Sequence, residues 1–194
     1  MRRREFVAVV GSAIAFPLVA YAQKQFTIGY LGNASTDDAP DWFAGFRDGL
    51  RENGFKVGEN VTIEYLSTQG HLGRFAEYAN DLVRNNVDVI FAADNAGALA
   101  AKAATGAIPI VFAIGGDPVA LGLVASINRP GGNITGVSFL STTVMAKRLE
   151  LLHEAVPSAS TIAALINPAN ANAQIDQAQL EKAARAFFSS PLSA

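Results

Sequence analysis

Residues 108–139 read IPIVFAIGGDPVALGLVASINRPGGNITGVSF, and this stretch decides the fold. Its apolar run from Ile110 to Ile114 has no polar alternation, as expected of a strand that is covered on both faces. The run ends in the GGDPV loop, residues 115–119, where paired glycines let backbone approach a ligand closely. Asp117 stands at a helix start, so we predict a short helix next. The turn at 129–133 then leads into a second strand, 134–139.

The rest of the chain alternates strand-like and helical patterns, which is typical of a parallel sheet with helices on both faces. Apolar or alternating runs predict strands at 26–31, 61–66, 87–92 and 110–114. Helical periodicity predicts helices at 41–53, 72–83, 96–104, 145–155 and from about 174 onward. The helix at 145–155 is expected to direct Leu149 and Leu152 inward, and a strand at 161–166 is expected to begin a second sheet.

Four segments closely resemble the ABC-transporter substrate-binding proteins of the family that includes the tryptophan-binding TrpX-like proteins: Val87 to Thr105, Gly115 to Val119, Asn128 to Phe139 and Lys147 to Pro157. The resemblance implies a periplasmic-binding-protein-like α/β fold with two lobes around a cleft. It also implies a small solute in that cleft and delivery to a membrane permease powered by a separate ATPase. We therefore expect a first lobe at 23–140 and a second lobe beginning at 141.

Members of this family continue for well over a hundred residues beyond the point where this chain departs from their pattern, near Phe187. We interpret the chain as truncated in its second lobe, residues 141–194. The expected fold is thus a doubly wound parallel sheet plus the first βα unit of an incomplete second lobe. A lone βα unit leaves a sheet edge unpaired, so we expect it to be marginally stable and ligand affinity to fall.

The amino terminus has the three parts of a secretory signal peptide. Arg2, Arg3 and Arg4 precede an uncharged run at 6–20, and small residues at Ala20 and Ala22 predict cleavage between Ala22 and Gln23. The run is shorter than the roughly 18 residues of a membrane-spanning helix. Ordinary secretion and the twin-arginine route both stay open, and either predicts a periplasmic protein with residues 1–22 removed.

Composition excludes several classes of function. The chain has 194 residues, half of them apolar, and a formal net charge of -2, which argues against nucleic acid as a partner. It has no cysteine, which excludes a disulfide framework, thiolate catalysis and cysteine-ligated metals. We expect a monomer without cofactor or metal, not inserted in the membrane after cleavage.

Polar residues at the predicted strand ends are the candidates for solute binding, since these ends converge on one edge of the sheet. Each has an alternative role as a helix cap or turn residue. Trp42, Phe43 and Phe46 are candidates for an aromatic wall, although the helical spacing of Trp42 and Phe46 favours core packing. The ligand-binding candidates are Asn33, Ser35, Asp94, Asn95, Gly116, Asp117, Ser138 and Asn167.

Two other functions stay open. An α/β enzyme is disfavoured because the chain has only His71 and His153 as histidines and lacks the G-x-S-x-G, phosphate-loop and H-E-x-x-H motifs. A sensor domain that reports a solute to a membrane receptor uses the same fold. Adjacent permease and ATPase genes favour transport, whereas an adjacent histidine kinase gene favours sensing. The preferred interpretation is an extracytoplasmic solute-binding component of an ABC importer that holds a small polar or amino-acid-like solute without chemical change.

Overall fold

Five parallel strands form one sheet in the order β2-β1-β3-β4-β5 in the computed structural model, which describes residues 25–34, 40–141 and 144–187. The strands are β1 (Phe26–Gly32), β2 (Val61–Ser67), β3 (Val89–Ala92), β4 (Ile110–Ile114) and β5 (Ile134–Ser138). This sheet confirms the predicted α/β class, and β2 lies at its edge as its alternating pattern predicts. Strand order reverses between β1 and β3, which makes this pair the topological switch point.

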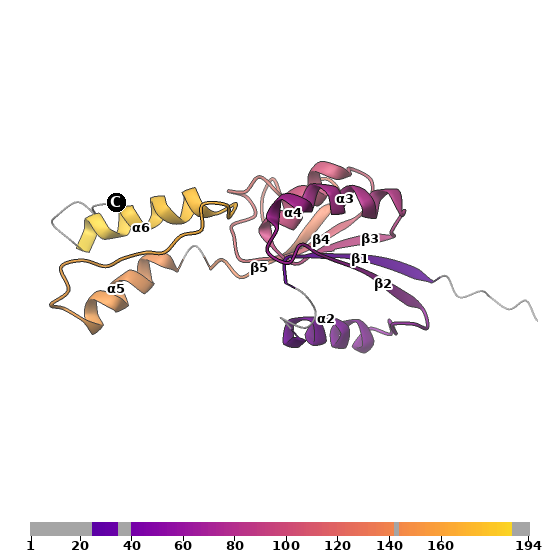
Figure 1. The fold of residues 1–194 in the computed structure, drawn as a ribbon, viewed down its shortest axis with the longest axis horizontal. Coiled ribbons are helices and arrows are strands. Elements are labelled where there is room, and N and C mark those ends of the chain that lie inside the picture. Colours follow the sequence, from indigo (N-terminus) through magenta and orange to yellow (C-terminus); the bar gives the residue numbers. More distant parts are fainter. Residues whose placement is uncertain (1–24, 35–39, 142–143, 188–194) are drawn as a thin grey trace, which may run out of the picture.

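Helices cover both faces of the sheet, so the fold is doubly wound (Figure 1). The short η1 (Leu72–Arg74) leads into α3 (Phe75–Arg84), and α3 and α4 (Asn95–Ala104) lie on one face. The helix α2 (Pro40–Glu52) lies on the other face. The predicted signal peptide, with its cleavage site between Ala22 and Gln23, lies outside the described residues. Among the described residues, no helix combines the length and apolar character needed to cross a membrane.

The main core lies between the sheet and the pair α3 and α4. Leu31, Ile90 and Phe112 face this side from three adjacent strands and are almost fully buried. Leu82 of α3 and Ala98 of α4 belong to the same buried cluster. The small alanines of α4 allow its backbone to approach the sheet closely, which explains why an alanine-rich segment is used here.

Aromatic rings fill the opposite side, between the sheet and α2. The ring of Tyr30 lies 5.4 Å from Phe43 and 5.4 Å from Phe46 between centroids, and it stacks on Tyr65 at 4.8 Å. The predicted inward position of Phe46 is thereby confirmed, and half-buried Phe43 packs against the same ring. Burial, with added repulsion from Tyr65 and Asp94, raises the pKa of Tyr30 to about 12, so its hydroxyl stays neutral at physiological pH.

The prediction of a short helix after the GGDPV loop is wrong. Residues 118–122 form successive turns, with the Leu121 amide donating to the Asp117 carbonyl at 2.9 Å and the Gly122 amide to that of Val119 at 2.9 Å. Gly122 has a φ of +68°, in the left-handed region that terminates helices. The cap position at Asp117 is real, but the chain leaves helical geometry after one turn.

The predicted strand at 161–166 is also wrong, because these residues join no sheet in the described structure. They run as an irregular connection from α5 (Met145–Ala155) to α6 (Ala173–Phe187), and Figure 1 shows this pair beside the sheet domain. An apolar pattern favours extended backbone, yet a strand exists only where a neighbour accepts its hydrogen bonds. Ile162 instead packs against a small cluster of Leu149 and the α6 alanines.

Only part of the predicted packing of α5 is found. Leu149 is 6% exposed and faces α6, whereas Leu152 is 52% exposed, so its predicted inward position is wrong. The domain boundary near Leu140 stays a prediction. The backbone changes direction there, since β5 ends at Ser138 and Leu140 has a φ of +46°.

Gly136 of β5 is required by the close approach of β4. A Cβ atom at this position would lie 2.1 Å from the Phe112 carbonyl oxygen and 2.6 Å from its ring. Gly136→Ala is therefore expected to lower the free energy of unfolding by about 1–3 kcal/mol, the usual effect of overpacking. Urea unfolding followed by circular dichroism measures this change. Gly106→Ala is the matched control, because no atom lies within 4 Å of its Cβ position, and equal stability of the two variants would contradict the prediction.

Candidate functional site

A cleft of about 400 Å³ lies at the carboxyl ends of the strands, beside the switch point, and we call it the strand-end cleft. Trp42 of α2 lies at its rim, and the turn between β3 and α4 supplies Ala93, Asp94 and Asn95. The end of β4 and the segment after β5 close the other side. The lining residues are Trp42, Ala93, Asp94, Asn95, Ala113, Gly115, Phe139 and Ser141.

Among the described residues, Asp94 is the one acidic side chain that lines the strand-end cleft. Its Oδ1 accepts a hydrogen bond from the Gly97 amide at 2.8 Å and caps α4, as the sequence allowed. Its Oδ2 is buried and has no hydrogen-bond partner among the described residues. Burial raises the pKa of the Asp94 carboxyl, and backbone amides, first that of Gly97, only partly oppose this rise. One carboxylate oxygen therefore caps α4, and the other is buried beside the cleft without a hydrogen-bond partner in the described part of the chain.

The glycine pair Gly115–Gly116 connects the remaining polar groups of the cleft. The Gly116 amide donates to Oδ1 of Asn95 at 3.1 Å, and the Gly116 carbonyl accepts from Oγ of Ser138 at 2.5 Å. The Gly115 carbonyl accepts from both the amide and Oγ of Ser141, each at 2.8 Å. Loops after β3, β4 and β5 are thus joined through one pair of peptide groups.

Two aromatic rings stand at the mouth of the cleft. Trp42 and Phe139 meet edge to face, with centroids 5.6 Å apart and an interplanar angle of 86°. Trp42 is 66% exposed and Phe139 is 56% exposed. The favoured core position of Trp42 is therefore wrong, although its neighbours in the helical pattern are in the core. Exposed rings in this arrangement offer an apolar surface to a ligand.

Of the eight predicted ligand-binding residues, the structure brings two, Asp94 and Asn95, into the lining of the strand-end cleft. Gly116 and Ser138 lie one step behind the lining: the Gly116 amide donates to Asn95, and the Ser138 hydroxyl donates to the Gly116 carbonyl. Ser35 lies outside the described residues. Contact of any of these residues with a solute stays a prediction.

The other predicted residues make local structural bonds. Oδ1 of Asn33 accepts from Oγ1 of Thr68 at 2.7 Å and from the Gly70 amide at 2.9 Å, which ties β1 to the loop after β2. Oδ1 of Asp117 accepts from the amides of residues 119 and 120 at 2.8 and 3.2 Å. Asn167 is exposed, and its Oδ1 accepts from the Ala169 amide at 3.0 Å. None of the three lines the cleft.

Sequence reasoning did not single out Phe139 and Ala113 as site residues. Both lie at the carboxyl ends of strands, as the predicted binding residues do, because Ala113 is near the end of β4 and Phe139 directly follows β5. The predicted candidates were mainly polar residues, so apolar residues that line the cleft were missed.

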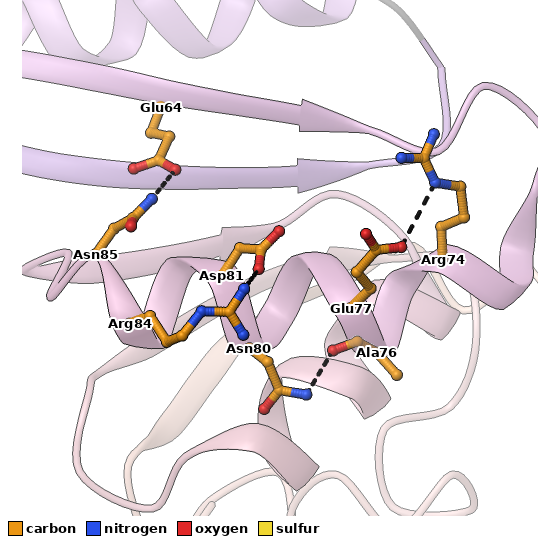
Figure 2. A network of polar contacts seen from close by, with 8 residues as sticks. All are labelled: Glu64, Arg74, Ala76, Glu77, Asn80, Asp81, Arg84 and Asn85. Atoms are coloured by element: carbon orange, nitrogen blue, oxygen red, sulfur yellow. Dashed lines mark hydrogen bonds and ion pairs between the residues drawn. The ribbon is translucent and has the colours of Figure 1, made fainter.

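A separate polar network runs along α3 (Figure 2). Arg84 pairs with Asp81, Arg74 lies 3.8 Å from Glu77, and Nδ2 of Asn85 donates to Glu64 of β2 at 2.5 Å. These side chains are largely exposed, and such ion pairs contribute little to stability. The network accounts for the charged surface of α3, outside the cleft. In the described part of the chain, no group of three or more acidic, histidine or cysteine side chains is placed to hold a metal ion.

Solved structures with the same arrangement come from three bacteria. A conserved domain protein from Vibrio cholerae is 30% identical with a TM-score of 0.78, covering 88% of this chain and 57% of that one. An ABC domain in complex with L-Trp from Streptococcus pneumonia is 27% identical with a TM-score of 0.74, covering 88% and 56%. The third is the ligand-free, open structure of a substrate binding protein with adhesive properties from Clostridium difficile. It is 30% identical in sequence with a TM-score of 0.59, covering 87% of this chain and 56% of that one.

Sequence comparison agrees with these structures. A tyrosine-binding protein from Clostridioides difficile is 36% identical over 132 residues, which make up 68% of this chain and 37% of that protein. The chain thus spans little more than a third of this relative and just over half of the solved structures. The sequence model described as ABC transporter substrate binding protein matches residues 34–187. From the sheet, the cleft and these matches, the chain belongs to the family of ABC transporter substrate-binding proteins.

Proposed function

We propose that this chain is the solute-binding component of an ABC importer and that its strand-end cleft binds an amino acid with an aromatic side chain. The observation that carries the proposal is the buried Oδ2 of Asp94, which has no hydrogen-bond partner among residues 25–34, 40–141 and 144–187, beside a cleft whose mouth holds the rings of Trp42 and Phe139. A carboxylate oxygen of this kind suits an ammonium group, and edge-to-face rings suit a flat apolar side chain. Two relatives, one named for tyrosine and one solved with L-Trp, support this class of solute.

The size and lining of the cleft support binding without chemical change. The cleft volume of about 400 Å³ falls within the range usual for small-molecule sites. Asp94 holds the ammonium group, Asn95 and the glycine pair orient the polar end, and the two rings shield the side chain from water. Membership of a family of binding proteins supports a role as a carrier rather than an enzyme.

The proposed setting is outside the cytoplasmic membrane. Residues 1–22 act as an export signal, and cleavage before Gln23 releases the chain into the periplasm. There the loaded protein delivers its solute to a membrane permease driven by a separate ATPase. The family match supports this setting, while the export route by Sec or the twin-arginine system is left open by the sequence.

Asp94→Asn tests the ammonium contact directly. The asparagine retains an Oδ1 that accepts from the Gly97 amide, so the cap of α4 survives while the negative charge is lost. We expect the dissociation constants for L-tryptophan and L-tyrosine to rise by about 10- to 100-fold, since hydrogen bonds to charged groups are the stronger class. Isothermal titration calorimetry measures both.

Asp117→Asn is the matched control for this charge removal. Asp117 caps a turn in the same way but lies outside the cleft lining. The Asp117→Asn variant is expected to bind both amino acids with the affinity of the unmodified protein. Equal loss in the two variants would show that capping, not ligand contact, explains the effect.

The affinity is expected to depend on pH through Asp94. Burial raises its pKa in the free protein, and a bound ammonium group lowers that pKa again. Binding between these two pKa values releases a proton, so affinity falls as the pH is lowered through the pKa of the free protein. The dissociation constant for L-tryptophan is expected to rise by up to about tenfold per pH unit below that pKa. Titrations across the acidic range measure the slope, and an equally steep slope for Asp94→Asn would contradict the assignment.

Trp42→Ala tests the aromatic mouth. Trp42 is exposed and makes its ring contact with Phe139, so its removal is expected to leave the fold intact. Ring pairs contribute about 0.5–1.5 kcal/mol, so the affinity for L-tryptophan is expected to fall roughly 2- to 12-fold. Competition with L-alanine provides the contrast, because a ligand without a ring should lose little. A uniform loss for both ligands would argue against ring contact.

A further inference from the structure

We propose that Asn172 is a positioning residue for the strand-end cleft, through which the start of α6 holds the glycine pair Gly115–Gly116 in place. The inference rests on the proposed function for the identity of the ligand, but the contact itself belongs to the free protein. Asn172 lies outside the cleft lining and far along the chain from the glycines. It acts on the ligand site through Gly116.

The side chain of Asn172 lies directly against Gly116. A Cβ atom built on Gly116 would lie 2.8 Å from Nδ2 and 2.8 Å from Oδ1 of Asn172. Asn172 is only 4% exposed, so its amide is enclosed where it meets the glycine. A methyl group at 116 would therefore push against Asn172, and also against Leu121. The φ of Gly116 does not lie in the left-handed region, so space and not backbone conformation favours glycine here.

Packing, not a hydrogen bond of its carbonyl, keeps the Asn172 side chain at this place. Oδ1 of Asn172 is buried and has no hydrogen-bond partner among the described residues. The backbone of Asn172 is fixed separately, because its amide donates to Oδ1 of Asn170 at 3.0 Å and its carbonyl accepts from the Asp176 amide at 2.8 Å. The side chain therefore moves with the first turn of α6.

A displacement of Gly116 changes the ligand site, because Gly116 is hydrogen-bonded to residues there. Its amide donates to Oδ1 of Asn95, and its carbonyl accepts from Ser138. Gly115, the next residue, lines the cleft and is bonded to Ser141. A shift of Asn172 by a few tenths of an ångström thus alters the positions of two polar groups that line the cleft. In this way the α5–α6 unit and ligand binding are coupled.

A double-mutant cycle in the full chain tests the contact. Gly116→Ala introduces the clash and is expected to weaken binding of L-tryptophan and L-tyrosine by about tenfold. Asn172→Ala removes support from the glycine and is expected to weaken binding by about threefold. The Gly116→Ala/Asn172→Ala protein is expected to bind within about twofold of Asn172→Ala alone, because the second change makes room for the new methyl group.

Leu121 provides the control for this rescue. Its Cδ1 lies 2.7 Å from the same Cβ position, so it also contacts an alanine at 116. Gly116→Ala/Leu121→Ala is expected to recover much less affinity, because the far end of a leucine side chain already moves aside easily. Gln174→Ala, at an exposed position of α6, is expected to bind as the unmodified protein does. Rescue by Leu121→Ala but not by Asn172→Ala would overturn the inference.

Hydrogen exchange in the ligand-free protein separates this inference from the proposed function. Gly116→Ala is expected to raise amide exchange in the first turns of α6, whereas the matched Gly106→Ala is not. Absence of that change would overturn the role of Asn172 whatever the protein binds. Failure of the unmodified protein to bind either amino acid, with the exchange result intact, would reject the proposed ligand and retain the contact. Non-additive effects of the two substitutions on binding, together with faster amide exchange in α6 of Gly116→Ala, support both the role of Asn172 and the proposed ligand.

Discussion

The parallel pairing of β1 with β3 is the constraint on which the rest of the structure depends. These strands are separated in the sequence by β2, yet they are neighbours in the sheet, with Tyr30 opposite Phe91 and Leu31 opposite Ala92. Burial drives this pairing, because Leu31, Ile90 and Ala92 share one core with α3 and α4. Since the strand order reverses here, the connections leave in opposite directions and open a crevice at the strand ends.

The candidate site uses the same crevice and adds two requirements. Close contact of loops requires residues without a Cβ, and the pair Gly115–Gly116 meets this need at the end of β4. Selective binding requires a polar group that the fold does not fully use. Asp94 is the candidate, because capping α4 occupies one carboxylate oxygen and leaves the other buried without a partner among the described residues. A structural cap and a candidate ligand group are thus parts of one side chain.

Prediction from sequence succeeded where a residue pattern is decided locally. The unbroken apolar run of β4, the alternation of β2 and the inward position of Phe46 on its helix were all predicted and are found in the structure. It failed where the outcome depends on a distant neighbour. The apolar residues at 161–166 pair with no strand in the part of the chain that the structure describes, and Trp42 shares a helical spacing with Phe46 yet faces the cleft. Helical period does not say which residues at the end of a helix extend beyond the sheet.

The sequence by itself determined the α/β class and the order of most elements, because apolar periodicity, helix caps and glycine-rich turns are local properties of the chain. The family was indicated separately, by the resemblance of four segments to its members. The sequence also placed Asp94 and Asn95 at a strand end. Only the tertiary structure decided that Asp94 keeps an oxygen without a hydrogen-bond partner among the described residues, that Trp42 and Phe139 meet at the mouth, and that Asn172 lies against Gly116. These contacts join residues far apart in the chain, and their geometry is set by how the sheet and its helices pack.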